Sequence, residues 1–205
     1  MKKILLVLLA AFPLVASAQK ADLLERFYNS MANSCVEVSY TYSARISGTL
    51  NNGSGVLLCQ GNMWTLKGNG VEMYCDSTTL WIVDPLMKEV VIEPAVAEGS
   101  SEFMDNPALM LSRLGDDFSV AVSRTIDDGK AVHYTLHPKV DIGIDYFNVE
   151  LKTSDASVRR ASFAMGDGTM VKIEVGSMKL TPKVPAETFR PKIVFSSEWI
   201  VNDLR

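Results

Sequence analysis

The chain has 205 residues, of which 47% are hydrophobic and 21% are charged, and its formal net charge is −4. This composition excludes a collagen-like or disordered chain and argues against a basic nucleic-acid-binding surface. The length fits one domain, including a single β-barrel or sandwich.

The first eighteen residues have the three parts of a secretory signal peptide. Lys2-Lys3 forms a positive region, residues 4–15 are apolar, and Ala16-Ser17-Ala18 is an A-x-A cleavage site. The apolar stretch is too short to span a hydrocarbon layer of about 30 Å, and the residue after the cut is not a cysteine that could be lipidated. We therefore expect cleavage after Ala18, export, and a soluble mature domain over residues 19–205.

The mature chain is predicted to begin with a helix and to continue as a β meander. Over residues 20–34, four apolar residues recur at the spacing of one helical face: Leu23, Leu24, Phe27 and Met31. Alternating patterns then predict ten strands, at residues 36–46, 55–67, 71–75, 79–83, 89–92, 118–126, 131–137, 146–152, 160–165 and 170–180. Asn51-Asn52-Gly53 is expected to turn the first hairpin. Because the turns are short and no βαβ rhythm is present, the sheet is predicted to be antiparallel.

A short apolar helix is expected between the fifth and sixth strands. Asn106 is a good N-cap, Pro107 suits the first helical position, and Gly115 ends the segment. Residues 107–114 are apolar almost all round, so this helix cannot lie on a water-exposed face of the sheet. The sequence therefore predicts that it covers or plugs an apolar surface.

Motifs for catalysis and metal binding are missing from the sequence. It contains no G-x-S-x-G, H-E-x-x-H, P-loop or C-x-x-C motif. On one strand, the only histidines, His133 and His137, stand about 13 Å apart, too far to share a zinc ion. We therefore expect no enzyme activity, no cofactor and no metal.

Three cysteines remain in the mature chain, Cys35, Cys59 and Cys75. Cys59 and Cys75 flank a hairpin, and an oxidising compartment would permit a disulfide between them. The favoured interpretation is that all three are small buried hydrophobic residues.

Several segments resemble the LolA-like outer-membrane lipoprotein carriers. They are Gly61-x-x-Trp64, the hairpin from Asp76-Ser77-Thr78-Thr79 to Trp81-Ile82-Val83-Asp84-Pro85, Asn106-Pro107-Ala108-Leu109, and Val184-Pro185-Ala186-Glu187-Thr188-Phe189. The ending Asp203-Leu204-Arg205 is similar to carriers from Bacteroidetes-type bacteria. The resemblance covers most of the mature chain and is most specific in the Thr79-x-Trp81-x-x-Asp84-Pro85 segment.

The resemblance implies an incomplete antiparallel β-barrel of about ten strands, with an N-terminal helix and a short apolar lid helix. It implies a periplasmic, monomeric, non-enzymatic carrier that shelters the acyl chains of lipid-modified proteins. An inner-membrane lipoprotein-releasing transporter would load it, and an outer-membrane acceptor would receive its cargo. The residues expected to line the cavity are Val38, Tyr40, Val56, Leu58, Trp64, Leu66, Trp81, Val83, Met104, Leu109, Met110, Leu111 and Leu114. An ordinary filled core is the alternative for the same side chains.

Lys67 is the candidate lid latch. Many members of the family carry Arg-Pro shortly after the aromatic strand, and that arginine helps to hold the lid closed; this sequence has Lys67-Gly68 instead. A lysine is a flexible point charge without the bidentate fork of arginine, so the latch should be weak. The alternative for Lys67 is an exposed hairpin residue.

Other functions remain open at this stage. One is a periplasmic binding protein for another hydrophobic ligand, such as a fatty acid or glycolipid. Another is a half-barrel regulatory or interaction protein of the cell envelope. A lipid-transferring hydrolase is disfavoured, because the sequence offers no recognisable nucleophile and base.

Overall fold

The computed structural model describes residues 22–95 and 114–205. The expected signal peptide lies outside these ranges, and so does the expected apolar helix apart from Leu114. None of the helices within the described ranges has the length and apolar character that a membrane span requires.

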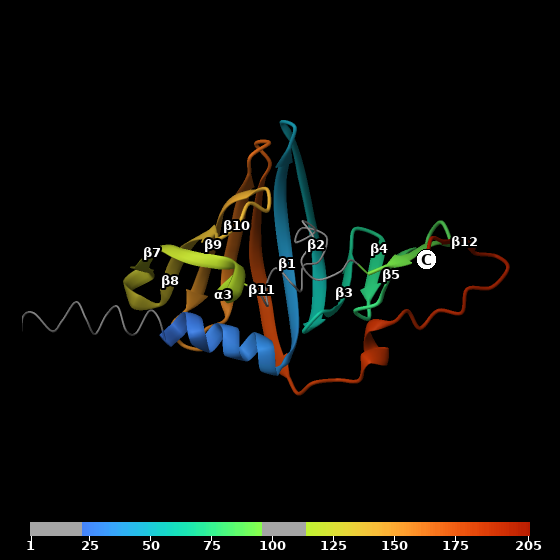
Figure 1. The fold of residues 1–205 in the computed structure, drawn as a ribbon, viewed down its shortest axis with the longest axis horizontal. Helices are drawn as coiled ribbons and strands as arrows, with labels where there is room; N and C mark the ends of the chain where they lie inside the picture. Colours follow the sequence, from blue (N-terminus) through green and yellow to red (C-terminus); the bar gives the residue numbers. More distant parts are fainter. Residues whose placement is uncertain (1–21, 96–113) are drawn as a thin grey trace, which may run out of the picture.

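Twelve strands form one continuous sheet that does not close on itself (Figure 1). They are β1 (Cys35–Ile46), β2 (Thr49–Gln60), β3 (Met63–Gly68), β4 (Val71–Cys75), β5 (Thr79–Asp84), β6 (Glu89–Pro94), β7 (Phe118–Ile126), β8 (Ala131–Pro138), β9 (Ile144–Lys152), β10 (Val158–Met165), β11 (Met170–Thr181) and β12 (Ile200–Asp203). Their order is β12-β6-β5-β4-β3-β2-β1-β11-β10-β9-β8-β7. All neighbours are antiparallel except β12, which pairs with β6 in parallel. The predicted mainly β fold, an incomplete barrel with an N-terminal helix, is confirmed.

The strand count and the first turn differ from the prediction. Residues 55–67 are not one strand, because Gly61, with a φ of 57°, turns the chain between β2 and β3. The first hairpin turns at Ser47 and Gly48, whose φ values of 48° and 81° match the positive dihedrals of a two-residue turn. Asn51-Asn52-Gly53 lies inside β2. A glycine is required at position 53, since a Cβ there would lie 2.6 Å from the Tyr42 ring.

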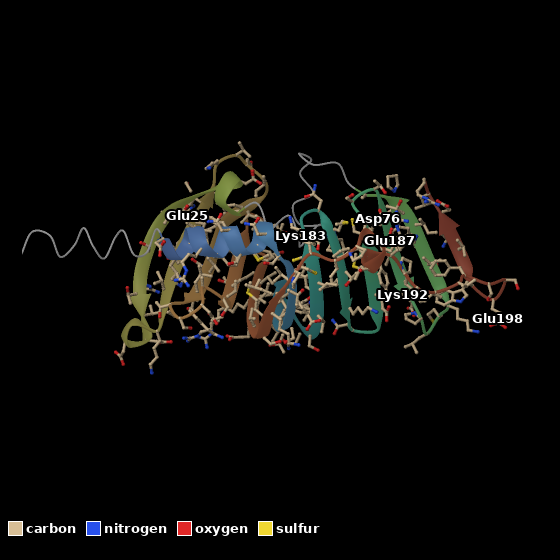
Figure 2. The ribbon with its side chains drawn as sticks, turned by 90° about the horizontal axis from the view of Figure 1, so that it is seen from below. Glu25, Asp76, Lys183, Glu187, Lys192 and Glu198 are labelled. Carbon is tan, nitrogen blue, oxygen red and sulfur yellow. The ribbon has the colours of Figure 1, made fainter. Side chains whose placement is uncertain are left out.

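Residues 22–33 form the predicted N-terminal helix, which lies along one face of the sheet (Figure 2). The four predicted apolar residues, Leu23, Leu24, Phe27 and Met31, are all buried in the main hydrophobic core. This core also contains Val36 of β1 and inward side chains from strands on both sides of β1, among them Trp64, Phe147 and Leu151. We call the sheet face that carries them the inner face.

A second apolar cluster lies on the opposite, outer face of β4, β5 and β6. It contains the buried Tyr74, Val83, Val90 and Ile92. The C-terminal segment covers this cluster with Ile193, Phe195 and Trp199 before it reaches β12. Figure 1 shows this segment running beneath the sheet from β11 to β12. The sequence prediction missed β12, which has only four residues and forms only because this segment returns to the edge of β6.

At Gly68 of β3, the backbone of β2 leaves no space for a side chain. A Cβ at this position would lie 2.4 Å from the backbone oxygen of Ser54, and neither strand can yield without breaking ladder hydrogen bonds. We expect Gly68→Ala to lower the free energy of unfolding by about 1–3 kcal/mol. Gly166→Ala is the matched control, because the nearest atom to a Cβ there is 3.8 Å away. Urea denaturation followed by tryptophan fluorescence measures both, and equal midpoints would contradict the prediction.

Candidate functional site

An apolar cavity of about 140 Å³ lies between helix 22–33 and the inner face of the sheet. The helix contributes Phe27 and Met31 to its wall. The strands contribute Val38, Tyr40, Leu57, Leu66, Phe147, Val158, Ala161, Ile173, Val175 and Met178. The phenol oxygen of Tyr40 is the single polar side-chain group in this set, so the cavity is suited to hydrocarbon.

The register of the three central strands determines which side chains reach the cavity. Val38 on β1 lies opposite Leu57 on β2 and Met178 on β11. A β-bulge between the Ser39 and Tyr40 pairs gives β11 one extra residue, so Val175 and Met178 share a face although they are three positions apart. The bulge therefore extends the apolar wall along β11.

Space inside the cavity wall is provided by a glycine. Gly55 pairs with Tyr40, and a Cβ at position 55 would lie 2.9 Å from the Tyr40 hydroxyl oxygen. The tyrosine ring can therefore lie over the backbone of β2.

Some of the predicted cavity residues line this cavity and others do not. Val38, Tyr40 and Leu66 do, as predicted. Trp64 is buried in the main core but is not part of the cavity wall. The cavity residue on β2 is Leu57, which corrects the prediction of Val56 and Leu58.

The error on β2 has a physical cause. Residues 56, 57 and 58 are all apolar, so the alternation within β2 does not decide which of them points inward. Pairing with β1 decides it, because Val38 and Leu57 are cross-strand partners on the same face. Val56 and Leu58 therefore point to the outer face, where Val56 is exposed.

Trp81 and Val83 also lie away from the cavity, which corrects a second prediction. On β5, Leu80 and Ile82 belong to the main core, whereas Trp81 and Val83 pack in the outer cluster beneath the C-terminal segment. Both sets of alternate residues on this strand are apolar because both faces are covered.

The predicted lid residues are not placed by the structure. Met104, Leu109, Met110 and Leu111 lie outside the described residues. Leu114 begins the short helix α3 (Leu114–Asp117), and its side chain is not described.

Nine cavity residues were not predicted as such. The sequence placed Phe27 and Met31 on a helix face but did not predict them as cavity residues. Leu57 was missed because the prediction turned Val56 and Leu58, its neighbours on β2, toward the cavity. The others lie on β9, β10 and β11: Phe147, Val158, Ala161, Ile173, Val175 and Met178. Alternation in these strands was a usable signal, but only the pairing of β11 with β1 and the strand order beyond it show that these residues share a face with Val38 and Tyr40.

Lys67 lies on the outer face of the sheet, and its expected role as a lid latch stays a prediction, because the expected lid lies outside the described residues. Its neighbours Trp64 and Leu66 point into the core, so alternation turns Lys67 the other way. Its Nζ atom lies 3.0 Å from the Glu72 carboxylate and 5.2 Å from the centre of the Tyr74 ring. Hydrogen bonding with Tyr74, and with Glu72, raises the pKa of Lys67.

The side chain of Asp76 accepts the hydrogen bonds that fix the turn before the Thr79-x-Trp81-x-x-Asp84-Pro85 segment. One carboxylate oxygen accepts hydrogen bonds from the Thr78 amide and hydroxyl and from the Thr79 amide, at 2.8–3.1 Å. The other accepts from Arg190 Nε at 2.7 Å. Burial acts to raise the pKa of Asp76, but these hydrogen bonds outweigh it and hold the pKa below its ordinary value. Figure 2 shows Asp76 beside the part of the C-terminal segment around Glu187, so the motif anchors that segment.

The cysteines and possible metal ligands add no chemistry to the cavity. Cys35, Cys59 and Cys75 are buried and form no disulfide, and burial raises the pKa of Cys59 to about 12. Within residues 22–95 and 114–205, no three His, Cys, Asp or Glu residues are grouped so that they could hold a metal ion.

Comparison with known proteins points to one family. Residues 64–192, more than half of the chain, match the family model described as outer membrane lipoprotein carrier protein LolA. No curated protein matches the chain.

Three solved structures are similar to this chain. An uncharacterized conserved protein from Thermus thermophilus is 14% identical, with a TM-score of 0.55, over 91% of this chain and 99% of that one. A LolA superfamily protein from Nitrosomonas europaea is 12% identical, with a TM-score of 0.44, over 84% and 97%. A DUF1329 family protein from Desulfovibrio piger is 12% identical, with a TM-score of 0.46, over 85% and 96%. Only the first of these structures has a TM-score above 0.5, and at 14% identity it supports the fold alone.

Stability should depend on the ionisation of Asp76. Because the pKa of Asp76 is lower in the folded protein than the value of about 3.9 in the unfolded chain, its contribution is present above pH 4 and lost as pH falls through the folded pKa. We expect Asp76→Asn to cost about 1.5–3 kcal/mol at pH 7, and the gap from wild type to shrink below pH 4.

Urea denaturation at pH 7 and at pH 3 measures this gap. Asp128→Asn, in the exposed turn after β7, is the control and should leave the midpoint unchanged. A gap for Asp76→Asn that is the same at both pH values would show that the carboxylate charge is not what holds the segment.

Proposed function

Because the chain belongs to the LolA family of outer membrane lipoprotein carrier proteins, we propose that it carries lipid-modified proteins through the periplasm towards the outer membrane by sheltering their acyl chains. The family match confirms the resemblance seen in the sequence. The observation that carries the proposal is the cavity beneath helix 22–33, whose lining is apolar apart from one phenol. The carrier performs no catalytic step, since sheltering an acyl chain requires only that the chain move from its membrane into the apolar cavity.

The size of the cavity indicates that a wall must move to admit a whole acyl chain. Its volume is about 140 Å³, and a dry cavity of about 150 Å³ accommodates a molecule the size of benzene. The closed cavity therefore holds only a short piece of a chain. A longer chain needs space that helix 22–33 occupies with Phe27 and Met31.

Helix 22–33 is suited to be the moving wall. A single residue, Ser34, connects it to β1, so a small change in backbone dihedrals there would swing the whole helix. The side chains of Ser30 and Asn33 donate hydrogen bonds to carbonyls of their own helix, which move with it. Its buried contacts with the sheet are made by apolar side chains, which have no fixed directional partners.

The free energy lost when helix 22–33 leaves the sheet is similar in size to the free energy gained when an acyl chain is buried. Moving the helix away exposes four apolar side chains, at a cost of about 6–12 kcal/mol if each contributes about 1.5–3 kcal/mol. A sixteen-carbon chain contributes roughly 13 kcal/mol, at about 0.8 kcal/mol per buried methylene. Because the two terms nearly balance, the carrier binds its cargo and can release it to an acceptor of somewhat higher affinity.

Loading and release require partners. No nucleotide-binding motif is present in the sequence, so energy for extracting a lipoprotein from a membrane would come from an inner-membrane transporter. An outer-membrane acceptor would receive the cargo. The carrier would act as a monomer after removal of residues 1–18.

A charge inside the cavity should abolish binding of acyl chains. We expect Val175→Asp to weaken binding of a fluorescent fatty-acid probe by at least roughly tenfold, because a carboxylate next to a dry acyl chain is costly. Val56→Asp makes the same change on the outer face of β2 and is the matched control. Val175→Thr keeps the shape and adds only a hydroxyl, so it tests the cavity if Val175→Asp folds poorly. Equal affinities for Val175→Asp, Val175→Thr and wild type would exclude the cavity as the binding site.

The cargo distinguishes this function from its alternatives. Native mass spectrometry of protein isolated from the periplasm should show a bound lipoprotein. A free fatty acid or glycolipid in its place would identify a binding protein for another hydrophobic ligand. An empty protein that co-purifies with a regulatory partner would favour the interaction role.

A further inference from the structure

The two ends of the sheet differ in what their loops expose. Strand pairing places five loops at one end, which we call the rim: residues 47–48, 69–70, 85–88, 139–143 and 166–169. At the opposite end, the described loops are residues 61–62, 76–78, 127–130 and 153–157, which consist of polar residues and glycine apart from the buried Ala156. Among the hairpin loops of the described residues, exposed large apolar side chains therefore lie only at the rim.

Large apolar side chains lie in solvent on several rim hairpins. Leu86 and Met87, in the β5–β6 loop, are 87% and 69% exposed. Ile46 and Leu50 flank the β1–β2 turn and are also exposed, and exposed Met170 pairs with Arg45 on the neighbouring strand. Figure 1 shows the β1–β2 and β10–β11 hairpins side by side, projecting furthest from the sheet. These exposed apolar side chains therefore lie at one end of the sheet, on separate hairpins.

The turns that carry these side chains are well defined. The Oδ1 atom of Asp84 accepts hydrogen bonds from the backbone amides of Leu86 and Met87, both at 2.9 Å. Ser47 and Gly48 adopt the two positive φ values of a tight hairpin turn. The loops therefore hold their apolar residues outward.

Basic residues accompany the apolar ones. Three rim positions next to an exposed apolar residue are cationic: Arg45, Lys88 and Lys139. The rim loops also carry the acidic Asp141 and Asp167, whose Oδ1 atoms accept hydrogen bonds from the backbone amides of Gly143 and Thr169. Lys88 Nζ lies 2.5 Å from Glu198, and because both side chains are exposed, a phosphate could replace this partner.

From these observations we propose that the rim docks on the surface of a phospholipid bilayer. The side chains of Ile46, Leu50, Leu86 and Met87 enter the boundary between headgroups and acyl chains, and the neighbouring cations contact lipid phosphates. The cavity strands β1 and β11 end at this rim, so docking would bring the carrier's sheet directly to a membrane. The inference goes beyond the proposed function, because docking needs no cargo.

The spacing of the tips favours a bilayer over a protein partner. The exposed side chains lie on separate hairpins, and β3 and β4 separate the β5–β6 tip from the β1–β2 tip in the sheet. A stable protein interface needs a contiguous, well-packed patch. A lipid surface is broad and deformable, and it accepts apolar side chains that insert independently.

Flotation with vesicles tests this proposal. The probes are large vesicles of phosphatidylcholine alone and of phosphatidylcholine with phosphatidylglycerol. The protein is taken as processed by the producing cell, with its N-terminus checked by mass spectrometry, because residues 4–15 would bind vesicles by themselves. Wild type should float with both vesicles, and more strongly with the anionic ones at low salt.

Two double variants and one control locate the contact. Ile46→Ser with Leu50→Ser, and Leu86→Ser with Met87→Ser, should each reduce the bound fraction several-fold, and all four changes together should abolish binding. Leu180→Ser at the opposite end is the control; Leu180 is 45% exposed, close to the 49% of Ile46, and its loss should change nothing. Arg45→Gln should weaken binding to the anionic vesicles only.

Three outcomes would overturn the proposal. They are wild type that floats with neither vesicle, rim variants that float as wild type does, and a Leu180→Ser variant that loses as much binding as they do. Binding of the rim variants to a soluble fatty-acid probe is measured in parallel. Since these variants leave the cavity intact, the probe should bind them normally, so failure of docking is distinguishable from failure of the carrier function.

Discussion

The structure depends on covering the apolar inner face of a sheet that does not close. β7 and β12 end the sheet at opposite edges and do not pair with each other, so none of the strands in residues 22–95 and 114–205 closes the sheet over its inner face. Helix 22–33 covers much of it with apolar side chains that are all buried. Burial of apolar surface is strong but has no preferred direction. The same contact can therefore stabilise the folded protein and still allow the helix to move.

Other parts of the chain are fixed by directional contacts instead. Where the C-terminal segment crosses the outer face, the Gln60 side chain exchanges two hydrogen bonds with the backbone of Val184. Further along, Arg190 pairs with the buried carboxylate of Asp76. These contacts have defined geometry, whereas the helix on the inner face is held by apolar contacts that have no preferred direction. In the proposed carrier, the inner face would open and the outer face would not.

The cavity is small because two side chains of helix 22–33 fill part of the inner face. Phe27 and Met31 take space that a chain would use. A carrier must avoid both an open apolar groove, which would aggregate, and a permanently filled core, which would exclude cargo. A movable apolar helix over a rigid sheet meets both requirements.

Local sequence patterns predicted most elements and the face of helix 22–33, because helical and strand periodicities are short-range properties. Alternation also identified Val38, Tyr40 and Leu66 correctly. It failed for residues 56–58, where every position is apolar, and for Trp81 and Val83, where both faces of the strand are covered. Family resemblance supplied the proposed function, which the residues alone left open. The sequence by itself thus determined the mainly β class, the N-terminal helix and the family. Only the tertiary structure decided which alternate residues face the cavity, that Lys67 and the Asp76 motif belong to the outer face, and that the C-terminal segment returns to β6. Those outcomes depend on pairing between residues distant in the chain, and no local pattern records which strand will become a neighbour.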